Sequence, residues 1–378
     1  MTGLAPRSVA VVLGTRPEII KLAPVIRQLG DAALVVHTGQ HYDETMSDVF
    51  LTEHGLDEPE VRLAAGGLAR AEQLSVMLHG TDRALAGRDL SAVVVQGDTN
   101  STLAGALTAN ARSVPLVHVE AGLRSYDRAM PEEHNRVMVD HLADALCAAT
   151  TDNVANLRRV GIPDHRIHLT GNTVVEAVMD QLGDPRDTLA IVESLGLQAN
   201  SYVLATIHRP ENTDDPAVLR TVLTELAQLP CRVVLPLHPR TQAAARRAGA
   251  ERELAALGVI APVGSRQFLA LAAHAAVLVS DSGGVQEECT VLKRPLVVVR
   301  RSTERPEALT DFAVLVQPGP DIGEAVRARL RDVDGWLARL AGLPSPFGDE
   351  DSAKRVVEVI RHSTQHRMSH LAPALTSA

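Results

Sequence analysis

Short apolar runs alternate with amphipathic segments along the whole chain, and this alternation restricts the fold more than any other feature. In the first half the runs 8–14, 33–39, 92–97, 115–120 and 144–150 are apolar, and helix-like segments such as 18–29 lie between them. Continuous apolar strands that alternate with helices are typical of a parallel sheet, which is buried on both faces and connected by right-handed crossovers. The first half therefore predicts an α/β domain.

The same alternation starts again in the second half. Strand-like runs lie at 202–207, 232–237, 275–280 and 295–300, with helix-like segments at 267–274 and 285–292. The chain has 378 residues, whereas single hydrophobic cores stop growing at about 250–300 residues. We therefore expect an α/β fold with two doubly wound Rossmann-like domains. The expected domains are residues 1–172 and 201–350, joined by a helix and linker at 173–200 and followed by a C-terminal helix at 351–378 that packs back on the first domain.

Composition and charge narrow the classes of function. The formal net charge is −9, whereas a nucleic-acid-binding surface is normally basic, so we expect no nucleic-acid partner. The cysteines Cys147, Cys231 and Cys289 show no Cys-x-x-Cys spacing, which is typical of a reducing compartment. We find no signal-peptide pattern and no apolar run of about 18 residues. The chain is therefore expected to be cytoplasmic and not associated with a membrane.

The loop after the first predicted strand carries two cations. It reads GTRPEIIK (residues 14–21), which lacks the Gly-x-Gly-x-x-Gly pattern of dinucleotide folds and gives no indication of NAD. Arg16 at a helix entry and Lys21 about one turn later are suited to clamp a diphosphate. For this motif alone, an ordinary helix start with two solvated cations is the better interpretation.

Three loops of the first half carry acids. Asp98 follows one predicted strand, Glu120 ends the next, and Glu132 begins the helix predicted at 131–142. Each has an ordinary structural role available, since Asp caps helices and first-turn acids interact well with the helix dipole. Because the carboxyl ends of parallel strands meet at one edge of a sheet, the three carboxylates together favour acid–base chemistry.

A Ser-Gly-Gly turn is the strongest single signal in the second half. Ser282, Gly283 and Gly284 stand between a strand and a helix, where backbone N–H groups can hold a phosphate. Glu288, on the same helix, is well placed to accept hydrogen bonds from ribose hydroxyls. A purely structural left-handed turn at the two glycines is the weaker interpretation. Other residues that suit an anion in the neighbouring loops are His208, Arg209 and Arg305.

No metal or nucleophile motif is present in the sequence. The chain has 15 histidines but no His-Glu-x-x-His spacing, and His134 and His141 are better explained as packing or surface residues. Neither a Gly-x-Ser-x-Gly elbow nor a P-loop occurs. We therefore expect a reaction without a metal.

Taken in order, these motifs resemble the non-hydrolysing UDP-N-acetylglucosamine 2-epimerases, a family with the glycosyltransferase-B (GT-B) architecture. The resemblance runs through residues 14–21, 39–41, 97–99, 118–124, 131–136, 170–173, 208–211, 281–288, 304–307 and 346–348. It implies two domains that face a central cleft, a UDP-sugar substrate, a homodimer and no cofactor. The catalytic residues that it implies are Asp98, Glu120, Glu132 and His208. The UDP-binding residues that it implies are Arg16, Lys21, Phe268, Ser282, Gly283, Gly284, Glu288 and Arg305.

The reaction implied by the resemblance is inversion at C2 of a UDP-linked 2-acetamido sugar through elimination of UDP and its re-addition. Three alternatives stay open: a hydrolysing epimerase, a glycosyltransferase of the same fold, and a UDP-sugar sensor without activity. The retained carboxylates and His208 argue against the sensor. Whether the sugar is N-acetylglucosamine or a 3-amino or uronic acid relative is also open.

The resemblance further implies a candidate regulatory site for a second substrate molecule. Its matching residues are Gln40, His41, Arg209 and His238. Here Asp43 follows the Gln-His pair and would repel a second diphosphate. We therefore expect weak or absent activation by substrate.

Overall fold

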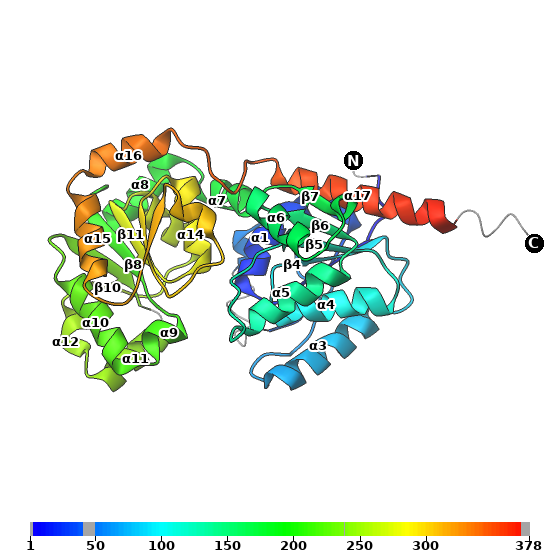
Figure 1. The fold of residues 1–378 in the computed structure, drawn as a ribbon, viewed down its shortest axis with the longest axis horizontal. Helices are drawn as coiled ribbons and strands as arrows, with labels where there is room; N and C mark the ends of the chain where they lie inside the picture. Colours follow the sequence, from blue (N-terminus) through cyan, green and yellow to red (C-terminus); the bar gives the residue numbers. More distant parts are fainter. Residues whose placement is uncertain (1–2, 41–49, 238, 372–378) are drawn as a thin grey trace, which may run out of the picture. The chain divides into compact units, whose positions relative to one another are not determined.

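The computed structural model describes residues 3–40, 50–237 and 239–371. The chain forms two compact units: unit 1 is Met1–Ala177 with Phe347–Ala378, and unit 2 is Val178–Pro346 (Figure 1). Each unit contains one parallel sheet with helices between its strands. The expectation of two doubly wound α/β domains is confirmed.

Unit 1 has a seven-stranded sheet in the order β3-β2-β1-β4-β5-β6-β7. The strands are β1 (Val9–Leu13), β2 (Ala33–His37), β3 (Val61–Arg62), β4 (Ala92–Gln96), β5 (Leu116–Ala121), β6 (Ala145–Ala148) and β7 (Ile167–Leu169). All neighbours are parallel, and β1 lies between β2 and β4 with Val9 opposite both Ala33 and Ala92.

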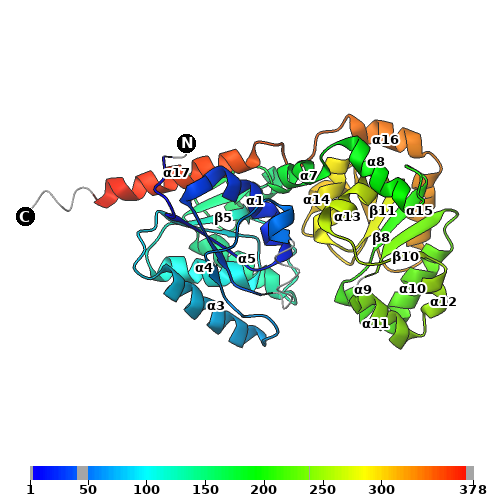
Figure 2. The same ribbon diagram turned by 180° about the vertical axis from the view of Figure 1, so that it is seen from behind.

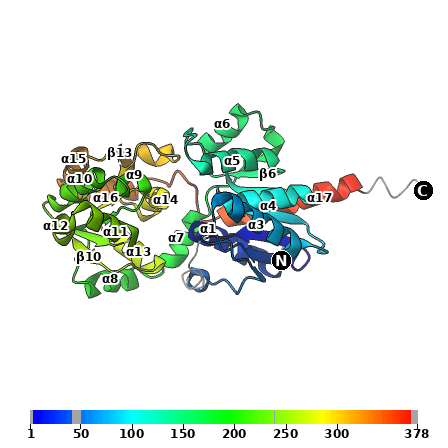
Figure 3. The ribbon, with the colours of Figure 1, turned by 90° about the horizontal axis from the view of Figure 1, so that it is seen from below.

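Helices cover both faces of this sheet. They are α1 (Arg16–Leu29), α3 (Arg70–Leu85), α4 (Asn100–Ala111), α5 (Pro131–Leu142), α6 (Thr151–Arg159) and α17 (Ser352–Leu371), with short 3-10 helices at Gly30–Ala32 and Asp164–Arg166. The chain passes from unit 1 to unit 2 within α7 (Val174–Leu182). Because side chains alternate along a strand, Val9, Val11 and Leu13 pack with α1 and α17 (Figure 2), whereas Ala10 and Val12 pack with α3 to α6. On that second face α4 contacts both α3 and α5 (Figure 3).

Unit 2 has a six-stranded parallel sheet in the order β10-β9-β8-β11-β12-β13. The strands are β8 (Tyr202–Thr206), β9 (Arg232–Pro236), β10 (Gly258–Ile260), β11 (Val277–Ser280), β12 (Leu296–Val299) and β13 (Ala313–Val316). The helices are α8 (Pro185–Ser194), α9 (Pro210–Thr213), α10 (Pro216–Ala227), α11 (Pro239–Ala248), α12 (Glu251–Ala255), α13 (Ser265–Ala273), α14 (Gly283–Leu292), α15 (Asp321–Leu330) and α16 (Val333–Ala341), with a 3-10 helix at Pro306–Leu309.

The two sheets share one strand order. In each sheet the chain adds strands on one side of the first strand and then crosses to add the remaining strands on its other side. In unit 1 this change of side lies between β1 and β4, and in unit 2 it lies between β8 and β11. Open α/β sheets bind ligands outside the carboxyl ends of the strands at such a switch point. The loops after these four strands are therefore where each unit is expected to hold its functional residues.

Several elements were not expected from the sequence. The strands β3, β7 and β10 have only two or three residues and form through pairing with a longer neighbour. Residues 185–194, within the stretch that we expected to include the linker, form α8 and pack against α13. The helix begins with an Asp184 side-chain cap and Pro185 in its first turn, which is a strong start signal.

The C-terminal segment of unit 1 is fixed to the segment that precedes α7. The Asn172 N–H donates to the Phe347 carbonyl over 2.7 Å, and the Ala353 N–H donates to Glu176 over 2.8 Å. Phe347 is buried, and α17 then runs along α1. Within the part of the chain that is described, no helix combines the length and the apolarity needed to cross a membrane.

Candidate active site

The switch point of unit 1 is built around the buried carboxylate of Glu18. It accepts hydrogen bonds from the Gly14 N–H (2.9 Å), the Thr99 hydroxyl (2.6 Å) and the Thr102 hydroxyl (3.1 Å). Burial raises the pKa of Glu18, and these hydrogen bonds oppose that rise. Glu18 thus ties the loop after β1 to the loop after β4.

Glycine is required at the start of the first loop because the backbone passes close to its neighbours. A Cβ atom on Gly14 would lie 1.9 Å from Thr38 Oγ1 and 2.4 Å from Ser101 Oγ. Those two hydroxyls are themselves 2.7 Å apart. The close approach sets the position of the loop that carries Arg16, whose guanidinium lies over the Phe50 ring at 4.5 Å.

Glu120 forms a buried ion pair with Lys21 at the end of β5. The Lys21 Nζ lies 2.7 and 2.8 Å from the two carboxylate oxygens, and the Gln96 amide also donates to this carboxylate. The side chains of Lys21 and Glu120 are 6% and 3% exposed. Glu120 has a φ of 64°, which is uncommon for a residue with a side chain and coincides with a register irregularity between Val119 and Ala121. Lys21, expected to be a diphosphate ligand, thus contacts a carboxylate within unit 1.

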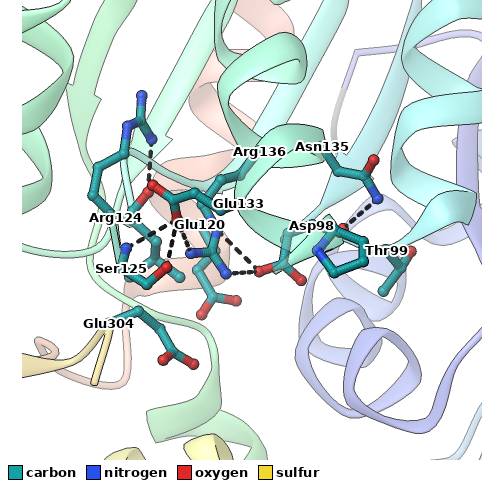
Figure 4. Close-up of polar contacts among 12 residues, drawn as sticks. Asp98, Thr99, Glu120, Arg124, Ser125, Glu133, Asn135, Arg136 and Glu304 are labelled. Carbon is teal, nitrogen blue, oxygen red and sulfur yellow. Dashed lines mark hydrogen bonds and ion pairs between the residues drawn. The ribbon is translucent and has the colours of Figure 1, made fainter. Parts of the chain in front are cut away.

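Asp98 is held by α5. Its carboxylate bonds to the Arg136 guanidinium, with 3.1 Å to Nε and a second contact to Nη2. The Asn135 amide donates to the Asp98 carbonyl over 2.9 Å. Figure 4 shows Asp98 between these two side chains. The preceding Gly97 has a φ of 73°, so a residue without a Cβ atom suits the turn into Asp98.

Glu132 and Glu133 are adjacent on α5 but have different surroundings. Glu132 is exposed and makes no hydrogen bond or ion pair with the described residues. Glu133 is buried and bonds to the N–H and hydroxyl of Ser125 at 2.9 Å, to the Tyr126 N–H at 3.1 Å and to Arg136 Nη1 at 2.5 Å (Figure 4). Burial would raise the pKa of Glu133, but the Ser125 hydrogen bonds and the Arg136 charge outweigh this effect, so the pKa is lower than its ordinary value.

A second buried polar cluster lies beneath these carboxylates. His118 contacts Asp140, and Asp140 also accepts from Arg124 Nη1 over 2.7 Å. Burial would raise the pKa of Asp140, but His118 and Arg124 lower it below its ordinary value. Glu133, Arg136 and Asp140 are three, four and seven positions apart on α5, which is the spacing of one helix face. Polar residues at this helical spacing indicate a shared buried face, whereas the sequence analysis considered only the acids at strand ends and at the helix start.

In unit 2 the buried carboxylate of Asp281 organises the loop after β8. It accepts from the backbone N–H groups of His208 (3.0 Å) and Arg209 (2.9 Å) and from the Asn212 amide (3.0 Å). His208 Nδ1 lies 3.1 Å from Asp281, and the His208 side chain is 42% exposed. Burial would raise the pKa of Asp281, but its contacts with His208 and Asn212 lower it. Asp281 therefore orients His208, with ring nitrogen Nε2 pointing away from the carboxylate.

A buried guanidinium cluster stands beside the start of α14. Glu304 bridges Arg300, at 2.9 Å, and Arg305, while Arg305 Nε donates to Glu287 over 2.7 Å. Burial would raise the pKa of Glu304, but the two Arg charges hold it far below its ordinary range. Burial and the nearby Arg300 charge lower the pKa of Arg209.

The Arg305 guanidinium lies directly against the backbone at the N-terminus of α14. A Cβ atom on Gly283 would lie 2.7 Å from Arg305 Nη1, whereas one on Gly284 would have only ordinary contacts. The Ser282 side chain does not cap this helix. Backbone N–H groups and a guanidinium thus meet at one place, which is a suitable arrangement for a phosphate.

The remaining predicted residues are distributed over both units. Phe268 is half-buried on α13 and Glu288 is half-buried on α14. The Gln40 amide oxygen accepts from the N–H and the hydroxyl of Ser101, each at 2.9 Å. His41 and His238 lie outside the described residues, so the candidate regulatory site stays a prediction. The sequence analysis did not single out Gln96, Glu133, Arg136, Asp140 or Asp281. Gln96 bonds to Glu120, Arg136 to Asp98, and Asp281 to the backbone of His208 and Arg209. Glu133 bonds in turn to Arg136, and Asp140 contacts His118.

Two Rossmann-like sheets, one with carboxylates and one with guanidinium groups at its switch point, define a sugar-nucleotide enzyme of GT-B architecture. The comparisons with known proteins agree: the family model for UDP-N-acetylglucosamine 2-epimerase matches residues 28–361. The chain belongs to the UDP-N-acetylglucosamine 2-epimerase family and is an isomerase, as the motifs predicted.

Individual relatives and solved structures cover nearly the whole chain. A UDP-N-acetylglucosamine 2-epimerase of Methanococcus maripaludis is 37% identical over 364 residues, covering 93% of this chain and 98% of the relative. A UDP-2,3-diacetamido-2,3-dideoxy-D-glucuronate 2-epimerase of Pseudomonas aeruginosa is 36% identical over 367 residues, covering 93% and 99%. The crystal structure of the Methanocaldococcus jannaschii UDP-GlcNAc 2-epimerase in complex with UDP-GlcNAc and UDP aligns with a TM-score of 0.84 at 35% identity, covering 94% of this chain and 99% of that one.

Proposed function

We propose that the protein interconverts UDP-N-acetylglucosamine and UDP-N-acetylmannosamine without hydrolysis. The observation that carries the proposal is the pair Asp98 and Glu120, at the carboxyl ends of the neighbouring strands β4 and β5. Each contacts a buried cation, Arg136 for Asp98 and Lys21 for Glu120. Two carboxylates oriented by cations at one sheet edge are suited to take and return a proton.

The chemistry explains why carboxylates and an anion site are both needed. The C2 proton of the sugar is not beside a carbonyl, so its direct removal is very unfavourable. When the C1–O bond to UDP breaks, UDP leaves with the electron pair, a base takes the C2 proton and a C1=C2 double bond forms. UDP then adds back to C1 while a proton reaches the other face of C2. No water is consumed in this sequence.

The proposal divides the work between the two units. Asp98, Glu120 and Glu132 act on the sugar as acids and bases, and negative charge near C1 stabilises the developing positive charge. Ser282, Gly283, Gly284 and Arg305 hold the departing diphosphate, together with His208 and Arg16. Phe268 stacks on the uracil ring, and Glu288 accepts from the ribose hydroxyls. The contacts of Lys21 favour a role in orienting the Glu120 carboxylate over a role at the diphosphate.

A second candidate substrate is the UDP-linked 2,3-diacetamido glucuronate. It is supported by the Pseudomonas aeruginosa relative, whose 36% identity is close to the 37% of the Methanococcus maripaludis relative. Both substrates undergo the same inversion at C2, so the carboxylate chemistry does not separate them. A comparison of kcat/KM for the two compounds decides between them.

The test of the proposed function is incubation with UDP-N-acetylglucosamine in D₂O, without NAD or added metal, followed by NMR. We expect UDP-N-acetylmannosamine to appear and both UDP-sugars to gain deuterium at C2, while UDP does not accumulate. The same result is expected with a chelator present. Stoichiometric release of UDP and free N-acetylmannosamine would instead identify a hydrolysing epimerase. Complete retention of the C2 proton would contradict the elimination mechanism.

A further inference from the structure

His118, on β5, is enclosed by acceptor groups on both sides of its ring. Nδ1 lies 2.8 Å from Asp140 Oδ1, and Nε2 lies 2.8 Å from the carbonyl oxygen of Gly97. The side chains of His118 and Asp140 are both 0% exposed. Water therefore does not take part in the hydrogen bonding of this imidazole.

The hydrogen-bonding geometry determines which protons the ring carries. A carbonyl oxygen only accepts, so Nε2 must carry a proton to bond with Gly97. Asp140 also accepts from Arg124 Nη1 (2.7 Å) and from the Gly122 N–H (3.3 Å). The ring therefore donates from Nε2 to the turn after β4 and contacts α5 through Nδ1.

Both backbone groups of Gly97 are held by β5. Its N–H donates to the Val119 carbonyl over 3.0 Å, and its carbonyl accepts from His118. Gly97 directly precedes Asp98, whose carboxylate is held from the other side by Arg136 of α5. Asp140 also belongs to α5. His118 thus connects the turn after β4 with the helix that orients the Asp98 carboxylate.

We propose that His118 is a positioning residue for the reaction, whose buried Nε2–H group sets the place of Asp98 by holding the Gly97 carbonyl. This inference rests on the proposed function for the role of Asp98. A plain structural alternative is that His118 only joins β5 to α5 through its ion pair with Asp140. The two roles use different ring nitrogens, so they can be separated.

Two neutral amide substitutions in the full chain form a matched pair. In His118→Gln the amide nitrogen reaches about as far as Nε2 and can still donate to Gly97, whereas in His118→Asn it reaches only as far as Nδ1, toward Asp140. We expect His118→Asn to lower kcat for C2 epimerisation about a hundredfold, because displacement of a catalytic group by about 1 Å costs on that order. KM and UDP affinity should change little. His118→Gln should recover most of the lost kcat.

The result that would overturn the proposal is a His118→Asn enzyme as active as His118→Gln, at matched thermal stability. If neither variant folds, ¹⁵N NMR of wild-type protein labelled in its histidines decides the matter. We expect Nε2 of His118 to carry a proton and to show a hydrogen bond to the Gly97 carbonyl, and a bare Nε2 on His118 would contradict the assignment. Because this measurement needs no substrate, it stands even if the wild-type protein epimerises none of the UDP-sugars tested.

Discussion

At the scale of single residues, three of the central carboxylates are bonded to a cationic or ionisable partner. Asp98 bonds to Arg136, Glu120 to Lys21 and Asp281 to His208. Removing one member of such a pair leaves an uncompensated buried charge, which is costly. Glu132 differs, because it is exposed and makes no such pair among the described residues. Conservative amide substitutions are therefore the right probes of these positions.

We expect Asp98→Asn and Glu120→Gln to lower kcat at least about a hundredfold each, the usual scale for acid–base groups. UDP affinity, measured by titration calorimetry, should stay close to that of the wild type, because the proposed nucleotide ligands, Arg16 and the residues of unit 2, are unchanged in both variants. Turnover near the wild-type rate in both variants would remove these carboxylates from the chemistry.

Glu132→Gln and Glu133→Gln give opposite expectations at neighbouring positions. Glu132→Gln should lower kcat and leave the free energy of unfolding unchanged. Glu133→Gln should lower the free energy of unfolding by about 1.5–3 kcal/mol, because it weakens charge-assisted hydrogen bonds to the Ser125 loop and Arg136. Urea unfolding and steady-state kinetics measure the two effects. If Glu132→Gln has no kinetic effect and Glu133→Gln abolishes turnover without unfolding, the catalytic role belongs to Glu133.

At the scale of secondary-structure elements, the site depends on the starts of two helices. The first two turns of α5 carry Glu132 and place Glu133 against the loop after β5 and Arg136 against Asp98 in the turn after β4. The first turn of α14 places backbone N–H groups next to the Arg305 guanidinium, which is possible because Gly283 has no side chain. The start of α5 thus carries the candidate acids, and the start of α14 carries the groups suited to an anion.

The first glycine of α14 provides a test of the anion site. Gly283→Ala should push the Arg305 guanidinium away, since the new Cβ would stand 2.7 Å from Nη1, and UDP binding should weaken. Gly342→Ala, in unit 2 but outside the proposed site, is the control for folding, because the nearest described atom to its new Cβ is 3.9 Å away. Thermal unfolding should be similar in the two variants, while calorimetry should separate them. Wild-type UDP affinity in Gly283→Ala would exclude this helix start and Arg305 from the nucleotide site.

At the scale of the whole molecule, the stability of each unit depends on a carboxylate that becomes buried and hydrogen-bonded when the chain folds. Folding lowers the pKa of Asp140 in unit 1 and of Asp281 in unit 2. A group with a lowered pKa binds fewer protons in the folded state, so its contribution to stability is complete above its ordinary pKa and is lost as the pH falls. Glu18, whose pKa is raised, works in the opposite direction.

We therefore expect the free energy of unfolding to fall as the pH drops from about 4, the ordinary carboxyl range, toward more acidic values. Asp281→Asn should flatten this acid dependence in unit 2, which contains Trp336, the single tryptophan of the chain, so fluorescence reports on that unit. The exposed Asp152, changed to Asn, serves as the charge control. An acid dependence in Asp281→Asn as steep as in the wild type would contradict the assignment.

The sequence by itself determined the two-sheet architecture and the loops that carry the candidate site residues. Central parallel strands are buried on both faces, so β1, β4, β8 and β11 are continuous apolar runs that are visible without a structure. The polar residues after those runs were candidates because the carboxyl ends of parallel strands share an edge. Edge strands such as β3 and β7 are too short to leave such a pattern.

Only the tertiary structure decided which residues contact one another. Lys21 and Glu120 are 99 positions apart, and Asp98 and Arg136 are 38 apart, yet each pair forms a direct ion pair. The strand order β1-β4-β5 brings the first pair together, and the crossover through α5 brings the second. A side chain's partner depends on the register and order of strands that are distant in sequence, and no local pattern encodes that order. For the same reason the sequence identified His118 and Asp281 only as members of motifs, whereas their burial and bonding partners come from the fold.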